Sequence, residues 1–230
     1  MWQQFQADFY LNFIKDDRWH YLTNGLKTTL IVTLLSALMG VVLGFLVAII
    51  RSTYENTGRL KILNAVCELY LTVIRGTPVV VQLMIIYFVI FASVRIDKTL
   101  TAIIAFGINS GAYQAEIFRS GIQSVPKGQF EAGRSLGFTY AQTMIHIIMP
   151  QAFRVCVPTL CNEYITLLKE TSVAGYIALE DLTKGGDIIR SRTYSAFMPL
   201  IAVALIYLVM VLILTKLVSL LERRLARGAR

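Results

Sequence analysis

Glu163 is an ionisable residue inside a long apolar run, where a charge is costly to bury and usually serves a function. It follows Asn162 within the run 155–168 and lies nine residues beyond Arg154. At 1.5 Å per helical residue, Glu163 is about 13 Å into a predicted membrane helix, close to the middle of the bilayer. A carboxylate at this depth either receives a positive group of a transported solute or forms a structural pair with a basic residue of a neighbouring helix.

Arg75 begins the sequence RGTP (75–78), which interrupts a second apolar run. The proline suits the first turn of a second half-helix, so the break exposes backbone N–H groups at a positive helix end. Broken helices hold substrate carboxylates in some membrane proteins, and Arg75 with Gly76 can hold a carboxylate here. The depth of Arg75, about 24 Å from the far end of the run, equally allows snorkelling or a pair with Glu68 or Glu116.

A third polar group lies on the predicted helix 99–122. Asn109, Tyr113 and Glu116 recur at i, i+4 and i+7 and form one polar stripe. The stripe predicts a surface that faces the subunit interior or a translocation path, with Tyr113 as a contact residue and Asn109 bonding across helices. The two histidines and three cysteines show no ligand spacing, so no metal site is predicted.

The elements that position these residues are membrane helices. The chain has 230 residues, of which 56% are hydrophobic and 16% charged, and its mean hydropathy is +0.61. Several apolar runs approach or exceed the ~18 residues that suggest a membrane span. We therefore predict an all-α integral membrane protein with five spans, at about 22–50, 58–93 (interrupted at 75–78), 99–122, 151–169 and 196–221. Small residues four apart in the first span (Ser36, Gly40 and Gly44) predict close packing with another helix of the same chain.

Charge predicts the orientation of these spans. The net charge of +8 comes from basic residues scattered beside the spans, which is typical of membrane topology rather than of nucleic-acid binding. Twelve Lys and Arg residues fall on one side and eight on the other. The positive-inside rule then predicts an extracytoplasmic segment at 1–19, a transmembrane domain at 20–222 with a cytoplasmic loop at about 124–150, and a cytoplasmic basic tail at 223–230.

The cytoplasmic loop contains the sequence FEAGRSLGFTYAQTMIHIIMP (130–150). Its apolar residues recur at rough helical spacing, and two glycines lie four apart, which predicts a short helix, a glycine-permitted turn and re-entry into the membrane at Pro150. Such an element either docks a soluble partner or merely connects two spans.

This loop resembles the EAA loop of ABC importer permeases, in which E-A-A, three residues and G lead to I-x-L-P. The matching positions are Glu131, Ala132, Gly137, Ile147 and Pro150, whereas Gly133 replaces the second Ala and Met149 the Leu. Further blocks at 73–88, 111–137, 149–173 and 178–183 resemble the polar amino acid branch of these permeases, so the resemblance covers about residues 20–220.

The resemblance implies the architecture of a type I importer permease and a dimeric membrane core, either homomeric or heteromeric. It implies that a coupling helix docks on a cytoplasmic ATPase dimer through Glu131, Ala132, Gly133, Gly137 and Pro150. It also implies an extracytoplasmic binding protein that delivers an amino acid to Glu163, Asn162, Arg75, Gly76 and Tyr113. The chain has no GxxxxGK[ST] phosphate loop, so ATP and Mg²⁺ are expected on the partner ATPase and no cofactor in this chain.

The predicted function is that of a non-enzymatic permease subunit in the cell (inner) membrane, which imports a polar or charged amino acid. Two other classes of protein fit the sequence less well. A secondary transporter or channel would give no reason for a docking loop, and an intramembrane enzyme would need paired catalytic groups that the sequence does not show.

Overall fold

The structure is a computed structural model that describes residues 2–227, and within them it contains helices but no strand. The all-α prediction is confirmed. In chain order the helices are α1 (Trp2–Phe9), α2 (Trp19–Thr57), α3 (Lys61–Gly76), α4 (Val79–Ile85), α5 (Lys98–Gln123), α6 (Lys127–Ser135), α7 (Tyr140–Thr143), α8 (Met149–Glu170), α9 (Leu182–Thr193) and α10 (Phe197–Arg227). Short π- or 3₁₀-helical segments are Tyr10–Ile14, Lys15–Asp17, Ile86–Ile90, Met144–Ile148 and Thr171–Ile177. Met1 and residues 228–230 of the predicted tail lie outside the described residues.

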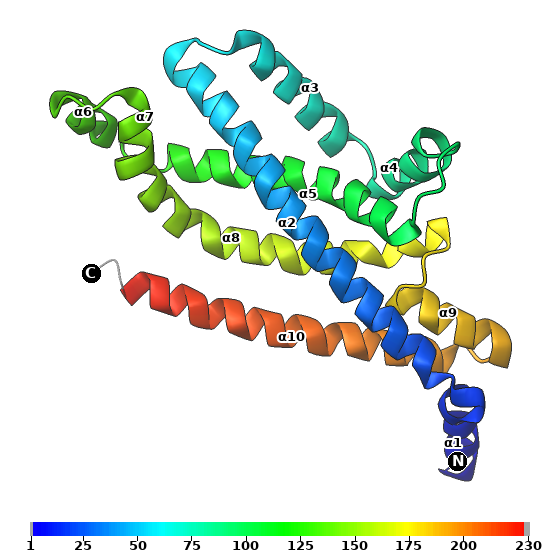
Figure 1. The fold of residues 1–230 in the computed structure, drawn as a ribbon. Helices are drawn as coiled ribbons and strands as arrows, with labels where there is room; N and C mark the ends of the chain where they lie inside the picture. Colours follow the sequence, from blue (N-terminus) through cyan, green and yellow to red (C-terminus); the bar gives the residue numbers. More distant parts are fainter. Residues whose placement is uncertain (1, 228–230) are drawn as a thin grey trace.

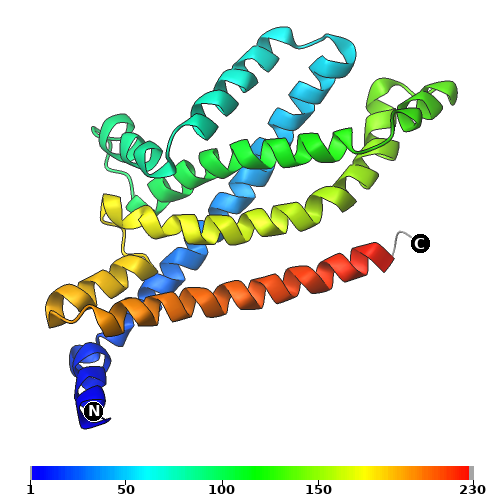
Figure 2. The same ribbon diagram turned by 180° about the vertical axis from the view of Figure 1, so that it is seen from behind.

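The long helices form an elongated bundle (Figure 1). Helices α5, α8 and α10 run side by side, and α2 crosses them with its closest packing against α5 (Figures 1 and 2). The α2–α3 turn, α6, α7 and the C-terminal end of α10 lie at one end of the bundle. Helices α1 and α9 lie at the other end (Figures 1 and 2). The predicted coupling loop and the predicted extracytoplasmic segments are therefore at opposite ends.

Three helices are long and apolar enough to cross a membrane: Trp19–Thr57, Tyr140–Ile177 and Phe197–Leu225. The pair Lys61–Gly76 and Val79–Ile90 passes the same test together, but it bends by 109° at the predicted break. Helix α5 has 26 residues and buries polar side chains such as Asn109 and Gln114 against its neighbours. Because other helices of the chain cover it, α5 needs less apolar surface than a lipid-facing helix. The total of five spans stays a prediction.

The predicted packing role of the small residues in α2 is confirmed. Ser36, Gly40 and Gly44 are all buried. A Cβ atom at Gly44 would lie 2.8 Å from the backbone nitrogen of Ala115, so only glycine lets α5 approach this closely. Helices α2 and α5 therefore pack in direct backbone contact at Gly44.

The fourth span begins earlier than the sequence suggested. Re-entry was expected at Pro150, but the continuous apolar helix runs from Tyr140 to Ile177. The side chain of Thr139 accepts a hydrogen bond from the backbone of Gln142 and completes a capping box, which starts the helix there. Pro150 has no backbone N–H and cannot donate a hydrogen bond to the carbonyl of residue 146. The π-helical turn Met144–Ile148, directly before α8, accommodates the missing hydrogen bond.

Candidate functional site

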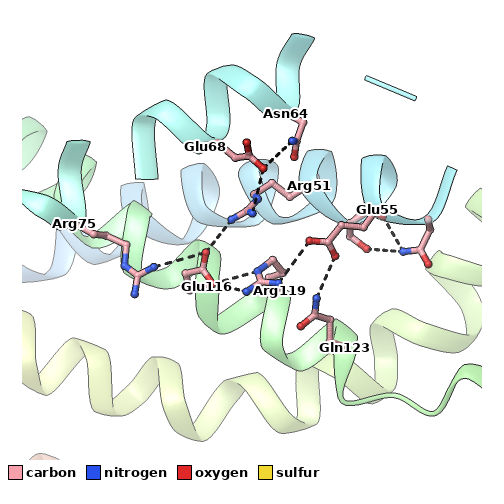
Figure 3. A network of polar contacts seen from close by, with 10 residues as sticks. Arg51, Glu55, Asn64, Glu68, Arg75, Glu116, Arg119 and Gln123 are labelled. Atoms are coloured by element: carbon pink, nitrogen blue, oxygen red, sulfur yellow. Dashed lines mark hydrogen bonds and ion pairs between the residues drawn. The ribbon is translucent and has the colours of Figure 1, made fainter. Parts of the chain in front are cut away.

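Six charged side chains meet where α2, α3 and α5 pack together, and we call them the charge cluster (Figure 3). They are Arg51, Glu55, Glu68, Arg75, Glu116 and Arg119. Three are basic and three acidic, so the cluster is neutral overall. Each of the six charges has a partner of opposite sign, which offsets the cost of placing the less exposed ones between helices.

Glu116 is the centre of the charge cluster. Its carboxylate accepts hydrogen bonds from Arg51 at 3.0 Å and from Arg119 at 2.9 Å, and it lies 3.8 Å from the guanidinium of Arg75. Its side chain is only 23% exposed. Glu116 therefore joins all three helices through one carboxylate, since Arg51 is on α2, Arg75 on α3 and Glu116 itself on α5.

A cavity of about 460 Å³ opens beside the charge cluster. It is lined by Arg51, Glu68, Leu71, Thr72, Arg75, Gly76 and Glu116. The side chains of Arg75 and Glu68 are 44% and 55% exposed, so a guanidinium and a carboxylate both remain open to a ligand. The guanidinium of Arg75 also lies 5.6 Å from the ring centroid of Tyr113. The structure thus brings together Arg75, Gly76 and Tyr113, and it confirms the alternative pair between Arg75 and Glu116.

Gln82 organises the break between α3 and α4. Its amide nitrogen donates to the carbonyl of Ile74 at 2.7 Å and to the carbonyl of Thr77 at 3.0 Å, which satisfies acceptors left over at the end of α3. Its carbonyl accepts from Asn109 of α5 at 2.9 Å. The predicted cross-helix bond of Asn109 is confirmed, and a second helix holds the break in place.

Asn162 and Glu163 lie on α8, apart from this cavity. Asn162 is exposed and Glu163 half-buried. Within the described part of the chain, neither forms a hydrogen bond or ion pair with Arg75, Gly76 or Tyr113, and Glu163 forms no ion pair with a basic side chain. The predicted substrate residues therefore fall into two groups, and the alternative of a structural pair for Glu163 finds no partner among the described residues.

The predicted coupling segment forms a short helix, α6, that ends in a glycine turn. The backbone N–H of Gly137 donates to Arg134 and that of Phe138 donates to Gly133, which together form a Schellman motif. Gly137 has a φ of +81°, a conformation that favours glycine. The predicted helix and glycine-permitted turn are both present.

Gly133 anchors α6 to the start of the next helix. It is buried, and a Cβ atom there would lie 2.7 Å from Cγ2 of Thr143. Glu131 and Ala132, in contrast, are exposed on the outer side of α6, as is Leu136 at 73%. The EAA-like segment is thus fixed on one face and open to a partner on the other.

The comparisons with known proteins decide the family. Residues 40–227 match the model of the family described as "Binding-protein-dependent transport system inner membrane component". The chain belongs to this family. It is a permease subunit of the amino acid ABC importers, located in the inner membrane as a multi-pass protein and not an enzyme.

Several relatives of this permease cover nearly its whole length. It is 38% identical to the L-cystine transport system permease protein TcyB of Bacillus subtilis (strain 168), over 93% of this chain and 90% of that protein. It is 39% identical to the glutamine transport system permease protein GlnP of Escherichia coli (strain K12), over 88% of this chain and 92% of that protein. A crystal structure of an amino acid ABC transporter with histidines contains a chain that is 41% identical, with a TM-score of 0.83 and coverage of 92% of this chain and 98% of that one.

The sequence reasoning missed part of the site in this permease. Arg51 and Arg119 were counted only as charges that set the topology, and Glu55 and Gln82 were not singled out. One signal was available: Glu68, Arg75 and Glu116 all lie within predicted spans. Ionisable residues inside a membrane tend to pair with one another, so their number pointed to a shared cluster.

Proposed function

We propose that this permease subunit carries a polar or charged amino acid into the cytoplasm and is driven by a separate ATPase that docks on its EAA loop. The relatives are named for L-cystine, arginine and glutamine. These solutes share an α-ammonium and an α-carboxylate and differ in their side chains. A site for the shared groups needs one positive and one negative contact.

The cavity beside the charge cluster supports a site for these groups. Its volume of about 460 Å³ is within the range of small-molecule sites. Arg75 can pair with the α-carboxylate in a planar two-bond geometry, next to the open backbone at Gly76 and the ring of Tyr113. The exposed carboxylate of Glu68 lines the same cavity and can meet the α-ammonium. On α8, apart from this cavity, the carboxylate of Glu163 beside Asn162 serves as a separate contact for an ammonium group or a cationic side chain along the path.

The continuous helix Tyr140–Ile177 is the observation that carries the coupling proposal. Its first turn contacts α6 through Thr143 and Gly133, and its middle carries Asn162 and Glu163. A force applied to α6 by an ATPase would be passed through this packed glycine to the helix with the substrate residues. Pro150 and the π-helical turn before it are the place where that helix can adjust.

The family implies a second permease subunit and an ATPase as partners. We further propose the orientation predicted from charge, with α6 in the cytoplasm and the N-terminal segment outside. An extracytoplasmic binding protein then delivers the amino acid to the end of the bundle that carries α9. ATP and Mg²⁺ are bound by the ATPase.

The proposal is tested by uptake into proteoliposomes that contain the permease with its co-purified ATPase and binding protein. Labelled arginine, cystine and glutamine are offered one at a time, with ATP enclosed or with only a proton or sodium gradient. We expect that at least one of the three amino acids is taken up when ATP is enclosed. None of them should be taken up when only an ion gradient is present. Uptake that follows the ion gradient and ignores ATP would contradict the proposal.

A further inference from the structure

The N-terminal helix α1 has one largely exposed aromatic face, of which Phe9 packs against Phe13 with 5.2 Å between the ring centroids. Trp2, Phe5 and Phe9 recur at i, i+3 and i+7, so they share one side of the helix. Their exposed fractions are 70%, 50% and 45%, and no residue of α1 is buried. The opposite side carries Gln3, Gln4 and Asp8. Helix α1 is therefore amphipathic, and its apolar face is made of aromatic rings.

The position of α1 is fixed by the segment that follows it. Asn12 is fully buried and donates to the carbonyl of Asp8 at 2.8 Å, and its side-chain oxygen accepts from Thr193 at 2.9 Å. Phe13 is buried against Leu22 and Val203, at the starts of α2 and α10. The helix is thus tethered to the end of the bundle rather than carried on a loose terminus.

Its direction also sets α1 apart from the spans. Asp16 and Asp17 have φ values of +56° and +51°, and this left-handed pair kinks the chain just before α2 begins. In both views the axis of α1 runs across that of α10, beyond the start of α2 (Figures 1 and 2). A helix that runs across α10 at this end of the bundle has the direction of a helix that lies along a membrane surface.

We propose that α1 lies in the membrane–water interface and inserts Trp2, Phe5 and Phe9 among the lipid headgroups and upper acyl chains. Tryptophan and other amphipathic aromatic side chains favour that depth. Tyr10 and Trp19, which are 58% and 40% exposed, extend the aromatic surface to the first turn of the membrane helix α2. Helix α1 and the π-helical turn Tyr10–Ile14 that continues it form a helical run close to the ~12–15 residues below which helices rarely form alone in water. The lipid surface provides a partner for the exposed part of the aromatic face.

Helix α1, held in the membrane–water interface, would fix the start of α2 at one depth in the bilayer. This role of α1 rests on the membrane location of the chain and not on its substrate or its ATPase. A docking surface for a binding protein or for a second copy of the chain is the competing reading of the same aromatic face, and the experiment below separates it from lipid.

The test uses the two tryptophans of the chain, Trp2 and Trp19. The full chain with Trp19→Phe is reconstituted alone into phosphatidylcholine vesicles, so that Trp2 is the sole emitter. We expect blue-shifted emission and strong loss of fluorescence with lipids brominated near the headgroup. Lipids brominated at the chain ends should quench less, and aqueous iodide should quench little.

Two further variants, each in the Trp19→Phe background, show whether the aromatic face is responsible. Phe5→Ser with Phe9→Ser should abolish quenching of Trp2 by brominated lipid and restore quenching by iodide. The matched pair Gln3→Ser with Gln4→Ser, on the polar side, should leave both unchanged. Strong iodide quenching of Trp2 in the Trp19→Phe chain with Phe5 and Phe9 intact would overturn the proposal. Insensitivity of Trp2 to both quenchers would also overturn it, because the rings would then be covered by protein.

Discussion

Substitution of Glu116 by glutamine should strongly destabilise the permease, because one carboxylate there serves three arginines. The change keeps the shape of the side chain and removes its charge. Arg51 and Arg119 then lose hydrogen bonds of 3.0 and 2.9 Å to an anion, and Arg75 loses a weaker contact at 3.8 Å. Buried guanidinium groups would be left without full compensation.

The size of the effect follows from burial. Breaking a buried ion pair by removing one partner costs ~3–5 kcal/mol. The side chains of Arg51, Glu116 and Arg119 are 18%, 23% and 27% exposed, so water screens part of this loss. We expect Glu116→Gln to lower the free energy of unfolding by roughly 2–3 kcal/mol. Glu55→Gln is the matched control: Glu55 is 36% exposed and its pair with Arg119 is 3.6 Å long, so the loss should stay below about 1 kcal/mol.

The assay exploits the buried free thiols of Cys67 and Cys156. A thiol-reactive fluorophore reports their exposure during heating in mild detergent. At ~2–4 °C per kcal/mol, Glu116→Gln should lower the midpoint by roughly 4–12 °C. Adding Arg51→Met to Glu116→Gln removes one uncompensated charge, so the double variant should be less destabilised than the sum of the two single variants. Equal midpoints for Glu116→Gln and Glu55→Gln, or strict additivity in the double variant, would refute the central role of Glu116.

Three other substitutions probe separate parts of the account. Gly133→Ala should weaken uptake and lower the thermal midpoint, because its Cβ would meet Thr143 at 2.7 Å, whereas Gly128→Ala, with open space at its Cβ, should change neither. Glu163→Gln should preserve assembly and basal ATP hydrolysis but weaken substrate engagement about ten- to a hundredfold, since a charge-assisted hydrogen bond contributes ~1.5–3 kcal/mol; unchanged uptake would make the residue a spectator. Hydrogen bonds from the backbone N–H groups of Leu100 and Thr99 lower the pKa of Asp97, the N-cap of α5. Its contribution to stability is therefore present above the ordinary Asp pKa and lost as pH falls through the lowered value, and Asp97→Asn should remove this dependence in pH-resolved thermal scans.

The helical fold was readable from the sequence because membrane spans are specified by long apolar runs. The packing of Gly40 and Gly44 against α5 was also predictable, since only glycine allows such close approach. The start of the fourth span was not. A capping box at Thr139 is a local hydrogen-bond motif that the hydropathy pattern does not show, and Pro150 was read as a boundary although it lies inside a continuous helix.

The candidate site was predictable in part for a similar reason. Arg75 and Gly76 were predicted from the helix break at residues 75–78 and Tyr113 from a polar stripe on its helix, and the structure brings the three together. The contacts that join α2 to α3 and α5 depend on tertiary packing. Arg51 and Glu116, for example, are 65 positions apart in the sequence, and no local pattern predicts that they meet. The distance between Glu163 and this group likewise depends on how α8 packs and not on its own sequence.

The central claim is that α6 passes the action of an ATPase to the helix that carries Glu163. The most direct measurement is ATP-driven amino acid uptake by Glu131→Lys in proteoliposomes with the ATPase present, beside the control Gln129→Lys on another side of α6. Both residues are exposed, so both variants should insert and fold as the wild type does. The account predicts that Glu131→Lys abolishes uptake while Gln129→Lys largely preserves it. Wild-type uptake by Glu131→Lys would contradict it.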